Sequence, residues 1–187
     1  MVALTTEQYK NIIEVMNQGF KSEDKEFRGN NRIATILVIQ ANLGLRIGDI
    51  LSLRLNDIIK DGDRYRLNII EDKTDKKRTF TVPQEIYNYI KMYTLENSIK
   101  STSKIFDITV RAVQKQLKLV TQYLELQNIS THSFRKYFAT QIYINNNYNV
   151  ALVKELLQHS DLKTTQKYIN IGTETIEKAL NNHIQLL

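Results

Sequence analysis

Five side chains of this 187-residue chain have the types and the spacing needed to hold a phosphodiester and attack it. They are Arg46, His132, Arg135, His159 and Tyr168. His132 and Arg135 are three residues apart, and Tyr168 follows His159 by nine residues. An arginine is always charged and offers phosphate two parallel donors, so these two arginines could clamp phosphate oxygens. A histidine titrates near neutral pH and could add a donor or accept a proton.

Tyr168 would be the attacking group in such a site. Its phenol needs help, because an ordinary tyrosine has a pKa of about 10. Positive charge around the phosphate gives that help, since attack adds charge to the nonbridging oxygens. Taken alone, Tyr168 is one of ten tyrosines, most of them suited to packing, and Arg135 alone would suit a surface salt bridge. The joint order and both spacings favour the catalytic interpretation.

The spacing of His132 and Arg135 also fits one helix. Side chains three residues apart on a helix emerge about 60° from each other on one face. Phe134, Phe138 and Ile142 fall on the adjoining face and could anchor the helix in the core. We therefore expect the histidine and the arginine to be held rigidly at the rim of the core.

Three motifs in this order resemble the catalytic domain of the tyrosine recombinase (phage integrase) family. They are GLRIGD at residues 44–49, HSFR at 132–135, and the pair formed by His159 and Tyr168. The resemblance runs from about Leu4 to Tyr168 and covers most of the chain. It implies the fold of that catalytic domain and a role for each matching residue.

The implied roles follow the family motifs residue by residue. Arg46 and Arg135 match the two family arginines, and His132 opens the HxxR motif. His159 matches a position where the family has His or Trp, and Tyr168 matches the nucleophile. Asp49 matches the acidic residue of the family's RxxE/D motif. A carboxylate facing the phosphate would repel it, so we expect Asp49 to orient a neighbouring side chain instead.

A lysine completes the implied set. The family places it in the turn between its second and third strands, as the acid that protonates the 5′-oxygen leaving group. The corresponding stretch here is EDKTDKKR at residues 71–78. Lys73 aligns best, because it is the first lysine and threonine follows it. Lys76 and Lys77 remain alternatives, and a solvated charged hairpin tip is the simpler interpretation.

Composition narrows the function classes. The chain has no cysteine, which excludes disulfides, thiolate nucleophiles and cysteine zinc sites. Neither HExxH nor a glycine-rich phosphate loop occurs, so neither a metal nor a nucleotide cofactor is expected. The net charge of +6 modestly favours a polyanionic partner. Without an apolar run of about 20 residues, we expect a cytoplasmic protein that does not cross a membrane. The resemblance implies that it is nucleoid-associated.

The pattern of apolar residues predicts a single domain over residues 1–187, mostly α-helical with a small three-stranded antiparallel sheet (α+β). Gly44 is expected to cap the second helix in the left-handed conformation, residues 21–31 to form a polar loop, and Pro83 to open the helix that ends near Glu96. Expected helices are 5–20, 32–43, 47–53, 83–96, 109–126, 133–145, 150–158 and 161–169, with a tail helix within 173–187. Expected strands are 57–60, 64–70 and 78–82.

The resemblance implies site-specific DNA recombination through a 3′-phosphotyrosyl intermediate on double-stranded DNA. It also implies a homo-oligomer, expected to be a tetramer on paired sites, and possible accessory DNA-bending proteins. Two alternatives remain. The chain could relax a single duplex, as a type IB topoisomerase does, or it could be a non-catalytic DNA-binding regulator. A family DNA-clamping domain is not seen ahead of this region, which suits either a fragment of a longer integrase or a compact recombinase. The tail at residues 173–187 could dock on a neighbouring protomer or on the protomer to which it belongs.

Overall fold

The computed structural model describes residues 2–22, 25–70, 77–157 and 165 of the chain. The chain divides into two compact units, Met1–Phe138 and Ala139–Leu187, and the division falls inside one helix, α6 (Thr131–Asn145). The prediction of one domain over residues 1–187 stays a prediction. Of the predicted site residues that the structure describes, four lie in the first unit.

The first helix, α1 (Thr6–Gln18), starts at a pair of reciprocal hydrogen bonds. The backbone N–H of Gln8 donates to the Thr5 hydroxyl at 3.1 Å, and the Thr5 N–H donates to the Gln8 side chain at 3.0 Å. Such a capping box satisfies donors that a helix leaves unpaired at its start. The predicted start of this helix is confirmed. Its end is at Gln18, two residues before the predicted Phe20.

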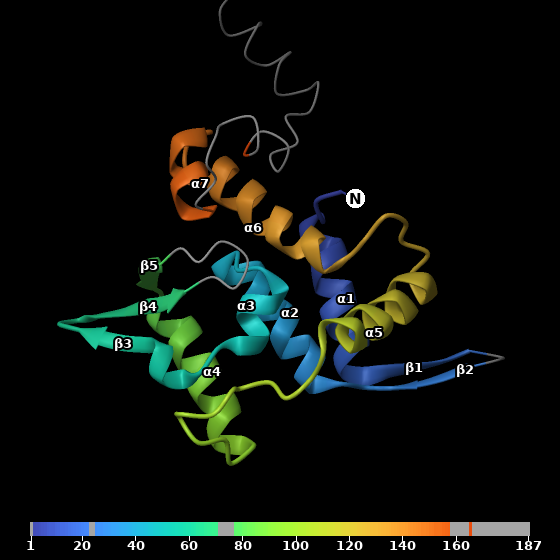
Figure 1. Ribbon diagram of the computed structural model, residues 1–187. Coiled ribbons are helices and arrows are strands. Elements are labelled where there is room, and N and C mark those ends of the chain that lie inside the picture. The colour runs from blue at the N-terminus through green and yellow to red at the C-terminus, as the bar shows by residue number, and fades with distance from the viewer. Residues whose placement is uncertain (1, 23–24, 71–76, 158–164, 166–187) are drawn as a thin grey trace, which may run out of the picture. The chain divides into compact units, whose positions relative to one another are not determined.

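A β-hairpin follows α1 where the sequence predicted a polar loop. Strands β1 (Gly19–Ser22) and β2 (Lys25–Arg28) pair antiparallel, with Phe20 opposite Phe27. The two rings stack with centroids 5.2 Å apart. Cross-strand aromatic pairs stabilise a hairpin, and the charged residues around these two phenylalanines conceal the pair in the sequence. The loop prediction for residues 21–31 was therefore wrong. In Figure 1 the hairpin projects from the helices of the first unit.

Helix α2 (Asn31–Leu43) is the central helix of the first unit and packs against α1, α3 and α4. Nine of its residues are buried, most of them apolar. It ends as predicted at Gly44, whose φ of 59° and ψ of 22° are left-handed. The Gly44 N–H donates to the Gln40 carbonyl at 3.0 Å. Helix α3 (Ile47–Ser52) then starts after Arg46.

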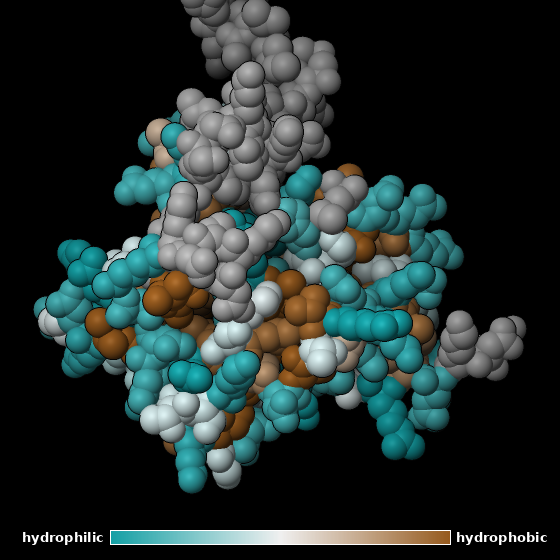
Figure 2. Space-filling model, in the orientation of Figure 1, coloured by the Kyte–Doolittle hydropathy of each residue, from teal (hydrophilic) through white to brown (hydrophobic). Residues whose placement is uncertain are grey.

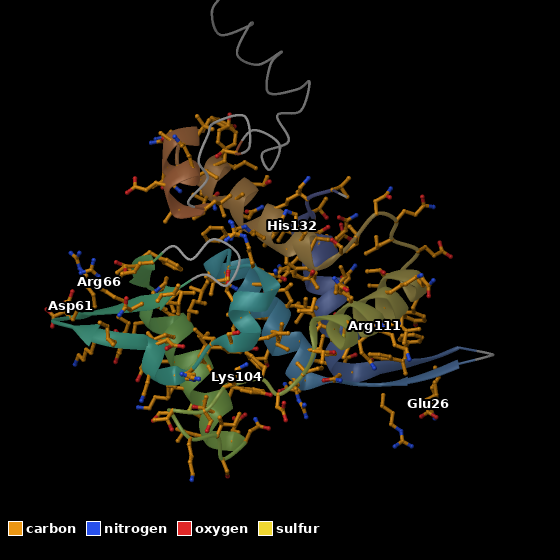
Figure 3. All side chains as sticks on the ribbon, viewed as in Figure 1. Glu26, Asp61, Arg66, Lys104, Arg111 and His132 are labelled. Atoms are coloured by element: carbon orange, nitrogen blue, oxygen red, sulfur yellow. The ribbon has the colours of Figure 1, made fainter. Side chains whose placement is uncertain are left out.

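The predicted three-stranded sheet is confirmed. A short 3-10 helix, η1 (Leu55–Asp57), leads into β3 (Ile58–Asp61), β4 (Arg64–Ile70) and β5 (Lys77–Val82), which pair antiparallel in that order. At the turn between β3 and β4, Arg66 and Asp61 form an exposed ion pair of 2.9 Å (Figure 3). The sheet packs on α4 (Gln84–Glu96), where the rings of Tyr65 and Tyr87 stack 3.8 Å apart.

The remaining described helices are α5 (Val110–Tyr123), α6 (Thr131–Asn145) and α7 (Val150–Leu157). Helix α5 ends at Tyr123, three residues before the predicted Leu126, because Glu125 adopts a positive φ of 56°, which a helix cannot include. Helix α6 starts at Thr131, two residues before the predicted Ser133. Of the predicted helix at 161–169 the structure describes Thr165 alone, and the predicted tail helix within 173–187 lies outside the described residues. The described chain is mostly helical with two small antiparallel sheets, so the predicted fold class is confirmed.

The core of the first unit joins α1, α2, α3, α4, α5, the sheet and the start of α6. Much of the described surface visible in Figure 2 is hydrophilic, and hydrophobic residues show between the hydrophilic ones. No described helix has both the length and the apolar character that a membrane span requires.

Candidate active site

The turn between α2 and α3 holds the first predicted site residue, Arg46. Gly44 is required in this turn for two reasons. Its φ is positive, and an added Cβ would collide with the ring of Phe138 on α6. The following Leu45 is fully buried. Arg46 itself is half-buried, with an extended backbone (φ −69°, ψ 151°) that caps α3. The Ile50 N–H donates to the Arg46 carbonyl at 3.1 Å and starts that helix.

The start of α6 holds His132 (Figure 3). Two serines organise this helix end. The Ser130 N–H donates to the Ser133 hydroxyl at 3.2 Å, and the His132 N–H donates to the Ser130 hydroxyl at 3.2 Å. These bonds satisfy backbone donors of the first turn in the way that N-capping residues do. His132 is half-buried there.

Arg135 lies one turn further along α6 and is 0% exposed. Its Nη1 donates a hydrogen bond to the backbone carbonyl of Gly44, 91 residues earlier in the chain. This contact joins the two arginine-bearing motifs, because Arg46 is only two residues beyond Gly44. The structure thus brings Arg135 to the turn that carries Arg46, as the catalytic interpretation requires. Sequence reasoning expected Arg135 at the rim of the core, whereas it is fully buried.

Aromatic packing anchors α6 as predicted. Phe134 and Phe138 are buried, and Ile142 is half-buried. Phe134 meets Tyr9 of α1 edge to face, with centroids 6.3 Å apart, and the rings of Tyr9 and Tyr137 stack at 4.9 Å. Burial, together with the neighbouring Tyr137 and Tyr89, raises the pKa of Tyr9 to about 12. The anchor is therefore neutral at physiological pH, which suits its place in the core.

Asp49 lies in the first turn of α3, three residues after Arg46, and is 4% exposed. It lines a groove of about 440 Å³ that Ser52, Asn68 and Lys104 also line. A buried carboxylate needs polar or charged neighbours, which fits a role in orienting a site residue. The role assigned to Asp49 stays a prediction.

Three predicted site residues, Lys73, His159 and Tyr168, lie outside the described residues. So does Lys76, one of the alternatives to Lys73. The other alternative, Lys77, starts β5 and is exposed opposite Ile70 of β4. Of the predicted site residues, the structure therefore describes Arg46, Asp49, His132 and Arg135.

Sequence reasoning missed Gln40 on α2. This residue is 1% exposed, and its Nε2 donates to the Leu45 carbonyl at 3.3 Å. The only signal in the sequence is a polar residue inside an otherwise apolar helix. No rule of composition or spacing singles it out.

Comparison with known proteins decides the family. Residues 3–174 match the phage integrase family. The chain belongs to this family. Among relatives, it is 31% identical over 155 residues to the probable integrase/recombinase YoeC of Bacillus subtilis, an alignment that covers 80% of this chain and 83% of that protein. It is also 27% identical over 194 residues to the tyrosine recombinase XerC of Caldanaerobacter subterraneus subsp. tengcongensis.

Solved structures of the family share the fold. The XerH recombinase in a post-cleavage complex with its difH substrate superposes with a TM-score of 0.73 at 21% identity, over 96% of this chain. The catalytic domain of bacteriophage HP1 integrase superposes with a TM-score of 0.67 at 17% identity, over 98% of this chain and 95% of that domain. The chain spans 51% of the XerC relative and 52% of XerH. It thus matches about half of these longer recombinases.

Proposed function

We propose that this phage integrase family member is a site-specific recombinase that breaks and rejoins DNA through a 3′-phosphotyrosyl bond. The observation that carries the proposal is the hydrogen bond from Arg135 to the Gly44 carbonyl. It unites the turn of Arg46 with the helix of His132 and Arg135. One site then contains two guanidinium groups and an imidazole. These groups can donate hydrogen bonds to a phosphodiester in the transition state of attack.

The two arginines have the electrostatic task. Attack on phosphorus adds negative charge to the nonbridging oxygens, and guanidinium donors held in place stabilise that charge without reorganising. Both come from rigid surroundings: Arg46 starts α3 beside a buried turn, and Arg135 is fixed in the core. His132 adds a donor to the same oxygens or accepts the phenolic proton.

The bond-making step follows from the family roles. The Tyr168 oxygen attacks phosphorus, a new bond joins the phosphate to the tyrosine, and the bond to the 5′-oxygen breaks. The tyrosine's proton passes to a histidine, and Lys73 gives a proton to the departing 5′-oxygen. His159 supports the phosphate as the second family histidine. A 5′-hydroxyl of a partner strand reverses the step, so the phosphodiester energy is retained.

The partner we propose is double-stranded DNA. Net charge is +6, and α5 has three exposed basic residues, Arg111, Lys115 and Lys118, with no acidic residue in its length. Figure 3 marks Arg111 on this helix. Basic clusters of this kind bind the phosphate backbone, with affinity that falls steeply as salt increases. We propose a tetramer on paired sites, with accessory bending proteins as a further possibility for assembly.

A covalent-adduct assay tests the function. The full chain first selects duplexes from a randomised pool, and nicked versions of a selected duplex then trap the cleaved state. We expect a denaturant-resistant adduct that mass spectrometry locates at Tyr168. Bound DNA without any adduct would make the chain a DNA-binding regulator. Supercoil relaxation in excess of recombination would make it a topoisomerase.

A further inference from the structure

The turn that carries Arg46 is held by side chains at two successive carbonyls. The Gly44 carbonyl accepts from Arg135, and the Leu45 carbonyl accepts from Gln40 Nε2 at 3.3 Å. The next carbonyl, that of Arg46, accepts from the Ile50 N–H. Every carbonyl between residues 44 and 46 therefore has a donor.

Gln40 acts on the peptide that leads into Arg46. The Leu45 carbonyl and the Arg46 nitrogen belong to one planar peptide group. A donor fixed on that oxygen resists rotation of the plane, and this rotation would change the φ of Arg46. The direction in which the Arg46 side chain leaves the backbone depends on that angle.

Packing alone does not explain a glutamine at this position. Gln40 is 1% exposed in a helix whose other buried residues are mostly apolar. Its Oε1 is buried and has no hydrogen-bond donor in the part of the chain that the structure describes. Burying an unsatisfied polar atom is unfavourable, and an apolar side chain of similar length would avoid it. Among the hydrogen bonds of the described residues, such a replacement would remove the one that the Gln40 amide donates to the Leu45 carbonyl.

We propose that Gln40 is a positioning residue that orients Arg46 for transition-state stabilisation by holding the Leu45 carbonyl. This inference rests on the proposed function. Gln40 does not touch the phosphate, and it acts only through the backbone of the turn. Small errors in placing a charged donor lower reaction rates far more than they lower affinity.

The test replaces Gln40 with methionine in the full chain, which keeps the length of the side chain and removes the donor. We expect Gln40→Met to form the Tyr168 adduct about 10- to 100-fold more slowly, with unchanged DNA affinity. The Leu45 carbonyl loses its donor, but the unsatisfied Gln40 Oε1 disappears at the same time. Because these two effects oppose each other, the melting temperature should stay near that of the wild type. A purely structural role would instead lower the melting temperature and the rate together, which would overturn the proposal.

Thr35→Val is the matched control, since Thr35 is also buried on α2 and its hydroxyl accepts from the Tyr89 hydroxyl of α4 at 3.4 Å. It should leave the adduct rate at the wild-type level. A second measurement adds Gln40→Met to Arg46→Lys, where the loss should shrink to under about twofold because the residues act as a unit. A full, additive loss there would refute action through Arg46. A wild type that forms no adduct would refute the proposed function, whereas equal rates for wild type and Gln40→Met would refute this inference alone.

Discussion

Arg135 and Gly44 are joined by a hydrogen bond from a fully buried guanidinium to a backbone carbonyl. The bond connects the second family arginine to the turn of the first. Phe138, one turn beyond Arg135, covers the same glycine with its ring. The α2–α3 turn and the start of α6 therefore pack together. A substitution in one of these segments should alter the conformation of the other.

Gly44→Ala should destabilise the protein more than Gly62→Ala. Both glycines have φ near 60°, so both substitutions place alanine in the left-handed region at about 1–2 kcal/mol. Only at Gly44 would the new methyl collide with the Phe138 ring, and overpacking adds about 1–3 kcal/mol. Denaturant unfolding of both variants measures the difference. Adding Phe138→Leu should recover part of the Gly44→Ala loss, and no recovery would show that backbone strain alone is responsible.

The two arginines should separate into different kinds of defect. Arg46→Ala should slow adduct formation about 10²- to 10³-fold, with stability near that of the wild type, because Arg46 is half-buried at a helix start. Arg135→Ala should slow cleavage similarly and also lower stability by about 1–3 kcal/mol, since it leaves the buried Gly44 carbonyl without its donor. The two variants are compared by measuring the single-turnover cleavage rate, the DNA affinity and the free energy of unfolding in urea. Equal losses in binding and cleavage would make either arginine an ordinary phosphate contact.

Tyr9 should make the protein sensitive to alkaline pH. Its pKa of about 12 is above the ordinary value of 10.0, so the fold favours the protonated phenol. The stabilisation is complete below pH 10 and is lost as pH rises through the folded value, because the unfolded chain ionises first. Melting temperatures between pH 9 and about 12 should therefore fall less steeply for Tyr9→Phe than for the wild type. Tyr148→Phe, at a tyrosine that is 52% exposed, should follow the wild-type curve.

Lys73 can be tested by changing the leaving group. A departing 5′-oxygen needs a proton, whereas sulfur is a much better leaving group and does not. Lys73→Ala should cleave ordinary DNA slowly but recover nearly the wild-type rate on DNA with a bridging 5′-sulfur at the scissile position. Arg46→Ala should gain much less, because its task is on the nonbridging oxygens. Rescue of Lys76→Ala or Lys77→Ala in place of Lys73→Ala would transfer the role to that lysine.

Local chemistry made much of the fold predictable. Gly44 was expected to end α2 in the left-handed conformation, and it does, because only glycine adopts φ of 59° without strain. The strands of the three-stranded sheet were predicted to within one residue at each end. The β1–β2 hairpin was missed because its stabilising pair, Phe20 and Phe27, lies among charged residues and forms only when the strands meet.

The sequence by itself determined which residue types stand in which order, and therefore the family and the set of groups suited to a phosphodiester. Those follow from composition and spacing along the chain. Only the tertiary structure decided that Arg135 is buried against the Gly44 carbonyl and that Gln40 holds the carbonyl of Leu45. These contacts join separate segments or cross a turn. They depend on the angles at which packed helices approach, which no spacing in the sequence records.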